Sequence, residues 1–175
     1  MLFKEQLAKN IKISISIFFM KSDYLDFYNN LVRLTTNKSL YDGFINKQDS
    51  FGDRLNLFLI HFAFVLKEFK SPENEKELQD LYDFNFRQLE LSIREIGYGD
   101  QSINKKMKDY INNFHAIVSE IHFWNNLTIA DREKKLSLFL DNFNNINYLV
   151  DYFEDFREKL SKNTLNSYLK SVSNI

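Results

Sequence analysis

The chain has 175 residues, a formal net charge of −1 and no cysteine. The lack of cysteine excludes disulfides, thiolate catalysis and cysteine-ligated zinc or iron–sulfur sites, and the near-neutral charge gives no overall attraction to nucleic acid or to an anionic membrane. Only four glycines and one proline occur, whereas β-rich proteins need these residues at many turns, so the composition favours long helices. The 18 phenylalanines and nine tyrosines predict a large aromatic core or an aromatic contact surface.

Residues 1–23 are expected to form a separate N-terminal segment. It contains the apolar run Ile13–Met20, a pattern that also occurs in targeting segments. Ser14 and Ser16 interrupt this run, no small-residue cleavage site follows it, and it is too short to span a bilayer. We therefore expect this segment to pack on the surface of the protein, with a targeting segment as the alternative.

A helical domain is predicted over residues 24–165. Apolar side chains at helical spacing indicate a helix over 24–34, and a loop over 37–52 contains a short helical piece around Leu40–Phe44. Residues 53–69 form the most apolar stretch and leave no polar face, which is typical of a central buried helix or of a membrane-inserted one. The uncharged run is too short for a membrane span, so the buried helix is favoured.

The next two helices are separated by a glycine turn. Ser71 and Pro72 predict the start of a helix that runs to Ile96, and Gly97 is placed to end it in the left-handed conformation. Ser102 is the expected cap of the following helix. Its apolar residues repeat with spacings of 4 and 3, which predicts a heptad seam: Ile103, Met107, Tyr110, Phe114, Ile117, Ile121 and Trp124.

The last part of the domain is predicted to be one long helix. Thr128 and Asp131 form a capping box, and a helix begins near Ala130 and continues beyond Leu160. Residues 166–175 are expected to be a frayed tail. The fold class that follows is all-α: a single domain of about six to seven helices packed around a central apolar helix.

No constellation of residues predicts catalysis or a cofactor. His61 lies within the buried run and is expected to be a hydrogen-bonded core histidine, and His115 and His122 are two helical turns apart, too far to share one metal as an i, i+4 pair would. Asp80 and Asp83 share a helix face, but no second acidic cluster completes a magnesium site. We expect no enzymatic activity, no metal and no cofactor.

Lys105, Lys106 and Lys108 are the candidate binding residues, together with Arg94. A helix that begins near Ser102 places the lysines in its first turns, where the macrodipole disfavours cations. Cations at a helix N-terminus suit a polyanionic partner or phosphate, and a solvated charge run is the alternative.

The stretch from Ser92 to Lys108 resembles a family signature. Arg94-Glu95-Ile96-Gly97-Tyr98-Gly99-Asp100, followed by Lys105-Lys106-Met107-Lys108, resembles the Arg-Glu-x-Gly-x-Gly-Asp and Lys-Lys-Met-Lys motifs of the ubiquinol–cytochrome c chaperone family. The resemblance covers roughly Tyr24–Ile121. Phe114-His115-Ala116-Ile117 departs from the family's Phe-Tyr-Gly-Arg and lacks its arginine.

The resemblance implies an assembly factor without catalytic activity. Its client would be an apolar membrane protein, a cytochrome b-type subunit of respiratory complex III, bound as a newly made chain near the ribosome and ribosomal RNA. The chain looks like a bacterial-type member, cytoplasmic or peripheral at the inner membrane, rather than a mitochondrial matrix protein. Alternatives are a generic helical interaction module and a small helical lipid- or isoprenoid-handling enzyme; the latter needs an acid-lined pocket.

Overall fold

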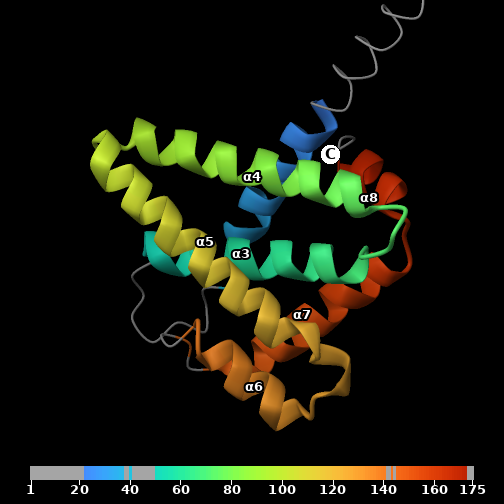
Figure 1. Cartoon of the computed structure of the whole chain (residues 1–175). Helices are drawn as coiled ribbons and strands as arrows, with labels where there is room; N and C mark the ends of the chain where they lie inside the picture. The colour runs from blue at the N-terminus through green and yellow to red at the C-terminus, as the bar shows by residue number, and fades with distance from the viewer. Residues whose placement is uncertain (1–21, 38–39, 41–49, 141–142, 144, 173–175) are drawn as a thin grey trace, which may run out of the picture.

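The computed structural model describes residues 22–37, 40, 50–140, 143 and 145–172, and it confirms an all-α domain (Figure 1). A first helix spans 22–35. The labelled helices follow in chain order: α3 (Phe51–Glu68), α4 (Glu75–Glu95), α5 (Asp100–His122), the 3-10 helix η1 (Trp124–Asn126), α6 (Ile129–Ser137), α7 (Ile146–Ser161) and α8 (Leu165–Val172). Residues 1–21 of the predicted surface segment 1–23, and residues 38–39 and 41–49 of the predicted loop 37–52, lie outside the described residues.

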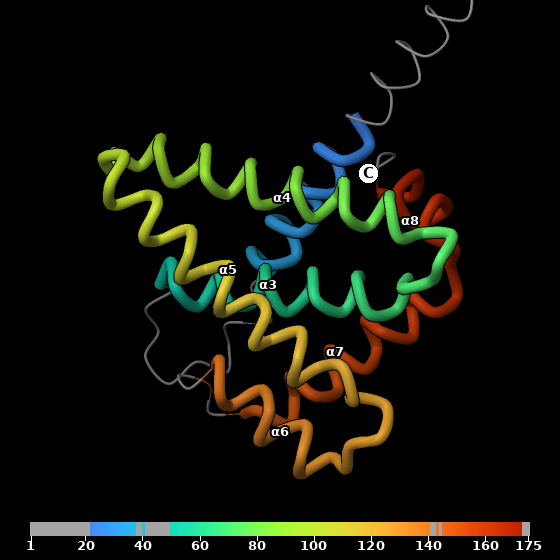
Figure 2. The backbone as a smooth tube through the Cα atoms, in the orientation of Figure 1, coloured from blue at the N-terminus to red at the C-terminus, as the bar shows by residue number. Residues whose placement is uncertain are grey.

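Helix α3 is the central helix of the domain, as predicted. Every residue from Leu57 to Val65 is buried, and the helix packs against α5 on one side and α7 on another. The tube in Figure 2 shows α3 crossing the middle of the molecule between these helices. Ser50 caps its first turn, because the hydroxyl oxygen accepts a hydrogen bond from the Asp53 N–H at 3.1 Å. Among the described helices, none combines the length and the hydrophobicity that a membrane crossing requires.

Stacked aromatic rings join α3 to its neighbours. The Phe62 ring stacks on Phe114 of α5 with centroids 5.2 Å apart, and Phe64 stacks on Phe153 of α7 at 5.3 Å. Trp124 of η1 packs edge-on against Phe64 at 5.1 Å. Offset-stacked and edge-to-face rings are the favoured geometries, so the aromatic surplus serves mainly as core.

The α4–α5 hairpin confirms one predicted helix end and corrects two predicted helix starts. Gly97 has a φ of 99° directly after the C-cap residue Ile96, as expected for a left-handed glycine stop. Helix α4 begins at Glu75 rather than at Ser71, because the Asn74 N–H donates to the Ser71 carbonyl at 3.1 Å and closes 71–74 as a turn. Helix α5 begins at Asp100 with Gly99 as N-cap, so Ser102 lies inside the helix.

The predicted seam of α5 faces the core. Ile103, Phe114 and Ile117 are buried, and Ile121, one turn later, is buried as well. Trp124 is buried too, but it belongs to η1 rather than to α5. Met107 and Tyr110 pack on the core while remaining partly exposed.

The C-terminal third differs from the prediction in two ways. The capping box is confirmed, since the Thr128 hydroxyl oxygen accepts from the Asp131 N–H at 3.2 Å, but the helix that it starts ends at Ser137. A second helix begins at Ile146, where the Asn145 side chain accepts from the Tyr148 N–H at 3.3 Å. The expected frayed tail over 166–175 is wrong as far as Val172, because α8 (Leu165–Val172) continues the fold and buries an apolar residue on each turn.

Candidate functional site

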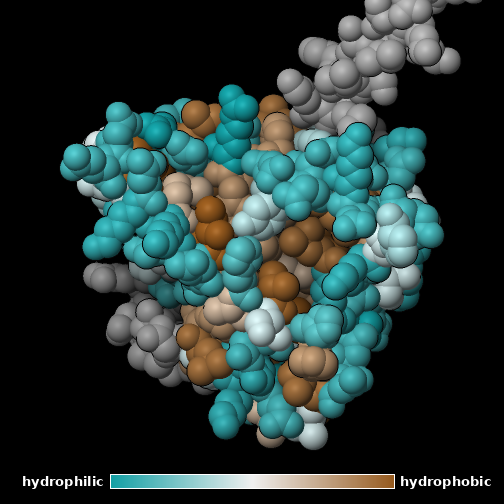
Figure 3. Space-filling model, in the orientation of Figure 1, coloured by the Kyte–Doolittle hydropathy of each residue, from teal (hydrophilic) through white to brown (hydrophobic). Residues whose placement is uncertain are grey.

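An apolar groove lies where α3 ends, α4 begins and α5 ends. Its volume is about 660 Å³, and it is open to solvent. Leu66 of α3, Leu78 of α4 and Val118 of α5 form its floor. Leu66 and Val118 remain partly exposed although they pack on the core. Figure 3 shows hydrophobic surface in the hollow between α4 and α5. Partly exposed aliphatic side chains in a concave surface are typical of a binding groove.

Tyr82 forms an aromatic wall of this groove. Its ring packs on Phe86 at 4.7 Å and on Phe114 at 5.9 Å, and its hydroxyl lies 3.3 Å from Nε2 of His115. Burial, followed by the charge of Asp83, raises the pKa of Tyr82, so the phenol stays neutral at physiological pH. The wall therefore presents an apolar ring face and a polar edge.

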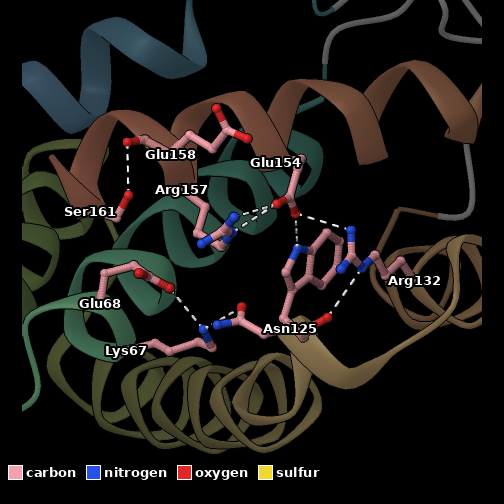
Figure 4. Close-up of polar contacts among 9 residues, drawn as sticks. Lys67, Glu68, Asn125, Arg132, Glu154, Arg157, Glu158 and Ser161 are labelled. Atoms are coloured by element: carbon pink, nitrogen blue, oxygen red, sulfur yellow. Dashed lines mark hydrogen bonds and ion pairs between the residues drawn. The ribbon is translucent and has the colours of Figure 1, made fainter.

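Charged and polar side chains form the rim. Lys67, Lys70 and Glu75 lie around the mouth, and His122 closes the α5 side. The Lys67 ammonium donates to Glu68 Oε1 at 2.7 Å and to Asn125 Oδ1 at 2.9 Å, so it is held in place by the segment that follows α5 (Figure 4). Among the described residues that line the groove, Glu75 is the one acid.

A charged network behind the rim fixes η1, α6 and α7 together. Glu154 of α7 accepts hydrogen bonds from Trp124 Nε1 at 2.9 Å, from Arg132 at 3.0 Å, and from two nitrogens of Arg157 at 2.9 and 2.5 Å (Figure 4). Burial opposes the charge of Glu154, but hydrogen bonds from Arg157 and Trp124 hold the pKa of that carboxyl below its usual range. The network involves residues up to 33 positions apart (124–157), and no local sequence pattern indicates it.

The three candidate lysines lie on α5, but they do not share one face. Lys105 and Lys108 are exposed, and they form no ion pair with the described residues. Lys106 turns toward the α4–α5 corner, where its Nζ lies 4.5 Å from the Tyr98 ring centroid. At about 100° per residue, Lys106 and Lys108 point roughly 160° apart. Because α5 begins at Asp100, the lysines lie past its first turn, where the helix dipole is weak, so the helix end does not disfavour them as the sequence predicted.

Arg94 connects the two helices of the hairpin. It donates to Glu90 Oε1 through Nε at 3.0 Å and through Nη2 at 2.7 Å, and it pairs with Asp100 at the start of α5. The hydrogen bonds that Arg94 donates to Glu90 and Asp100 raise the pKa of its guanidinium further. With its donors directed at two carboxylates, Arg94 positions the corner rather than presenting a free cation.

His61 is the hydrogen-bonded core histidine that the sequence predicted, and of the paired acids Asp83 is exposed while Asp80 is half-buried. His61 is fully buried, with Nδ1 2.7 Å from the Leu57 carbonyl and Nε2 2.7 Å from the Tyr152 hydroxyl. Burial lowers the pKa of His61 to about 4, against a smaller opposing effect of the hydrogen bond to Leu57. Asp83 is exposed and accepts from Gln79 at 3.0 Å. In the described part of the chain, no group of three or more potential ligands is arranged to hold a metal ion.

Comparison with known families identifies the segment that carries the groove. Residues 45–122, somewhat less than half of the chain, match the model of the ubiquinol-cytochrome C chaperone family, which confirms the resemblance seen in the signature turn. The match begins later than the expected Tyr24, and it includes every residue that lines the groove. The family description suggests a role in the assembly of complex III and a client protein as partner. No curated protein matches the chain. No solved structure matches it either.

Proposed function

We propose that this protein is a non-catalytic chaperone for a cytochrome b-type membrane subunit of respiratory complex III, and that the α3–α4–α5 groove holds an apolar helical segment of the newly made client. The observation that carries the proposal is the coincidence of the groove with the family segment: the floor, the wall and the rim all lie within 45–122.

The chemistry of the groove suits an apolar helix. Leu66, Leu78 and Val118 offer aliphatic contact from three different helices, and the Tyr82 ring adds an aromatic face. Helix-in-groove complexes use apolar anchors at i, i+3 or i+4, and i+7, with polar side chains kept at the rim. A membrane segment presents such anchors on every face, so a chaperone that binds it transiently needs apolar area without charge in the floor.

The two alternatives make different demands on the same groove. A lipid- or isoprenoid-handling enzyme needs several acids around its pocket, whereas Glu75 is the one acid among the described residues that line this groove. A generic interaction module would use the groove as well, but for a partner unrelated to respiration. The identity of the molecule in the groove therefore separates these functions.

Site-specific photocrosslinking tests the proposal. A photoreactive residue at Val118 reports on the groove, and one at Ala116, exposed on the outward side of the same helix, serves as matched control. In a bacterial host that assembles complex III, we expect the Val118 probe to give adducts with a cytochrome b-type subunit and the Ala116 probe to give few. Equal adducts from both positions, or Val118 adducts only with soluble proteins, would contradict the proposal.

A further inference from the structure

The corner between α4 and α5 exposes two large apolar side chains. Ile96 is 61% exposed and Tyr98 is 44% exposed. A Cβ added at Gly97 or Gly99 would meet no atom within 4 Å, so the turn stands free of the rest of the protein. Figures 1 and 2 both place this corner at the outer edge of the molecule, away from α6, α7 and α8. The fold therefore gives no packing role to these two side chains.

Cations lie beside these apolar side chains. The Lys106 ammonium lies over the Tyr98 ring at 4.5 Å, and Lys105 and Lys108 are exposed on the outward side of α5. The acids Glu90 and Asp100 are held by Arg94, and two further acids, Glu95 and Asp109, are exposed near the lysines. Lysines and an amphipathic tyrosine around an exposed aliphatic side chain are the residue types that anchor proteins at a lipid–water boundary.

We propose that the α4–α5 corner is a peripheral anchor that inserts Ile96 and Tyr98 into an anionic lipid surface, with Lys105, Lys106 and Lys108 at the headgroups. Ile96 favours an anionic membrane over a nucleic acid as the partner of this corner. An aliphatic side chain offers neither stacking nor a hydrogen bond to RNA, whereas it gains free energy in the acyl boundary. The groove takes no part in this contact, so the anchor and the proposed chaperone function can fail separately.

An anchor at this corner would hold the groove away from the lipid surface. Lys105 and His122 are 17 residues apart on the continuous helix α5, which corresponds to about 25 Å along its axis. The groove would thus face a client segment before that segment enters the bilayer.

Vesicle flotation with the full chain tests the anchor. The probes are phosphatidylcholine vesicles with and without phosphatidylglycerol. We expect binding to the anionic vesicles, and an at least tenfold weaker partition for the double variant Ile96→Ser, Tyr98→Ser, because the variant loses the apolar contact of both side chains with the acyl boundary. Lys105→Glu with Lys108→Glu should weaken partition at least about thirtyfold, the factor that corresponds to about 1 kcal/mol for each of the two lysines, and should reduce its salt dependence.

Matched variants elsewhere on the surface control for general effects. Phe123→Ser with Ile129→Ser removes two apolar side chains that are 61% and 65% exposed beyond the other end of α5, and Lys134→Glu with Lys159→Glu repeats the charge change. Both controls should partition within about twofold of the unmodified protein. Circular dichroism should show that all four variants fold.

Three results would overturn the proposal. The first is no binding of the unmodified protein to anionic vesicles. The second is an equal loss in the control variants. The third is a loss with the Lys105 and Lys108 changes but none with the Ile96 and Tyr98 changes; if RNA binding in a gel-shift assay followed the same pattern, the corner would be a nucleic-acid contact instead.

Discussion

Single side chains in the core carry much of the fold stability. Phe62 is fully buried, with its ring on Phe114 and edge-on to Phe27 at 6.0 Å, so it joins three helices. Phe62→Ala should lower the free energy of unfolding by about 3–5 kcal/mol, because it leaves a cavity at the centre of the domain. Phe51→Ala, at the exposed start of α3, is the matched control and should change it by about 0.5 kcal/mol or less. Urea unfolding measures both, and similar losses would show that α3 is not the core.

His61 should make stability depend on pH. Its pKa in the folded protein is about 4, below the value near 6.5 that an unfolded chain gives, so the unfolded state binds more protons below pH 6.5. The contribution to stability is complete above that pH and is lost as the pH falls toward 4, by about 2 kcal/mol between pH 7 and pH 5.

The variant His61→Asn isolates this effect. It should unfold more easily than the unmodified protein at pH 7, because it loses contacts with Tyr152, Phe153 and Phe156. Its free energy of unfolding should, however, change less between pH 7 and pH 5. Parallel curves from urea titrations at the two pH values would contradict a buried neutral imidazole.

At the scale of helices, features that depend on one or two turns of sequence were predicted, and features that depend on the rest of the fold were not. The apolar stretch of α3, the stop at Gly97 and the cap at Thr128 were readable because each depends on residues within one or two turns. The start of α4 was not, because a side-chain bond from Asn74 to the Phe69 carbonyl at 2.8 Å forms only once the α3–α4 turn has closed. Helix α8 was not predicted, because most of its residues are polar and its apolar stripe is short. This stripe is Leu165, Leu169 and Val172, and it is stabilised only by packing on the core.

Two glycines in the α4–α5 turn should respond in opposite directions. Gly97 has a φ of 99°, so Gly97→Ala should cost about 1–2 kcal/mol of stability. Gly99 is the N-cap of α5, with φ −73° and open space around it, so Gly99→Ser should be neutral or stabilise by up to about 1 kcal/mol, because serine is a better N-cap and restricts the unfolded chain. Thermal unfolding of the two variants checks this, and equal changes would mean that the turn adopts another conformation in solution.

At the scale of the molecule, residues 45–122 form the groove, and the Glu154 network of the C-terminal third packs behind its rim. The groove could not be predicted from the sequence, because Leu66, Leu78 and Val118 are far apart in the chain and become neighbours only when three helices meet. The Glu154 network could not be predicted either, because its residues come from different helices. Glu154 accepts a hydrogen bond from the buried Trp124, and Asn125 accepts one from Lys67 at the groove rim. Residues that follow the family segment therefore stabilise the rim of the groove.

The central claim is that the groove binds an apolar helix, and a titration tests it most directly. A labelled peptide with the sequence of a cytochrome b transmembrane segment, kept soluble in mild detergent, is titrated with the unmodified protein, with Val118→Asp and with Ser119→Asp, whose side chain is exposed on the next position of α5. A carboxylate in the apolar floor should weaken binding at least about tenfold, since leaving a buried charge unpaired costs more than 1.4 kcal/mol. The Ser119→Asp variant should bind like the unmodified protein, and both variants should unfold at similar temperatures. Equal affinity for all three proteins would contradict the account.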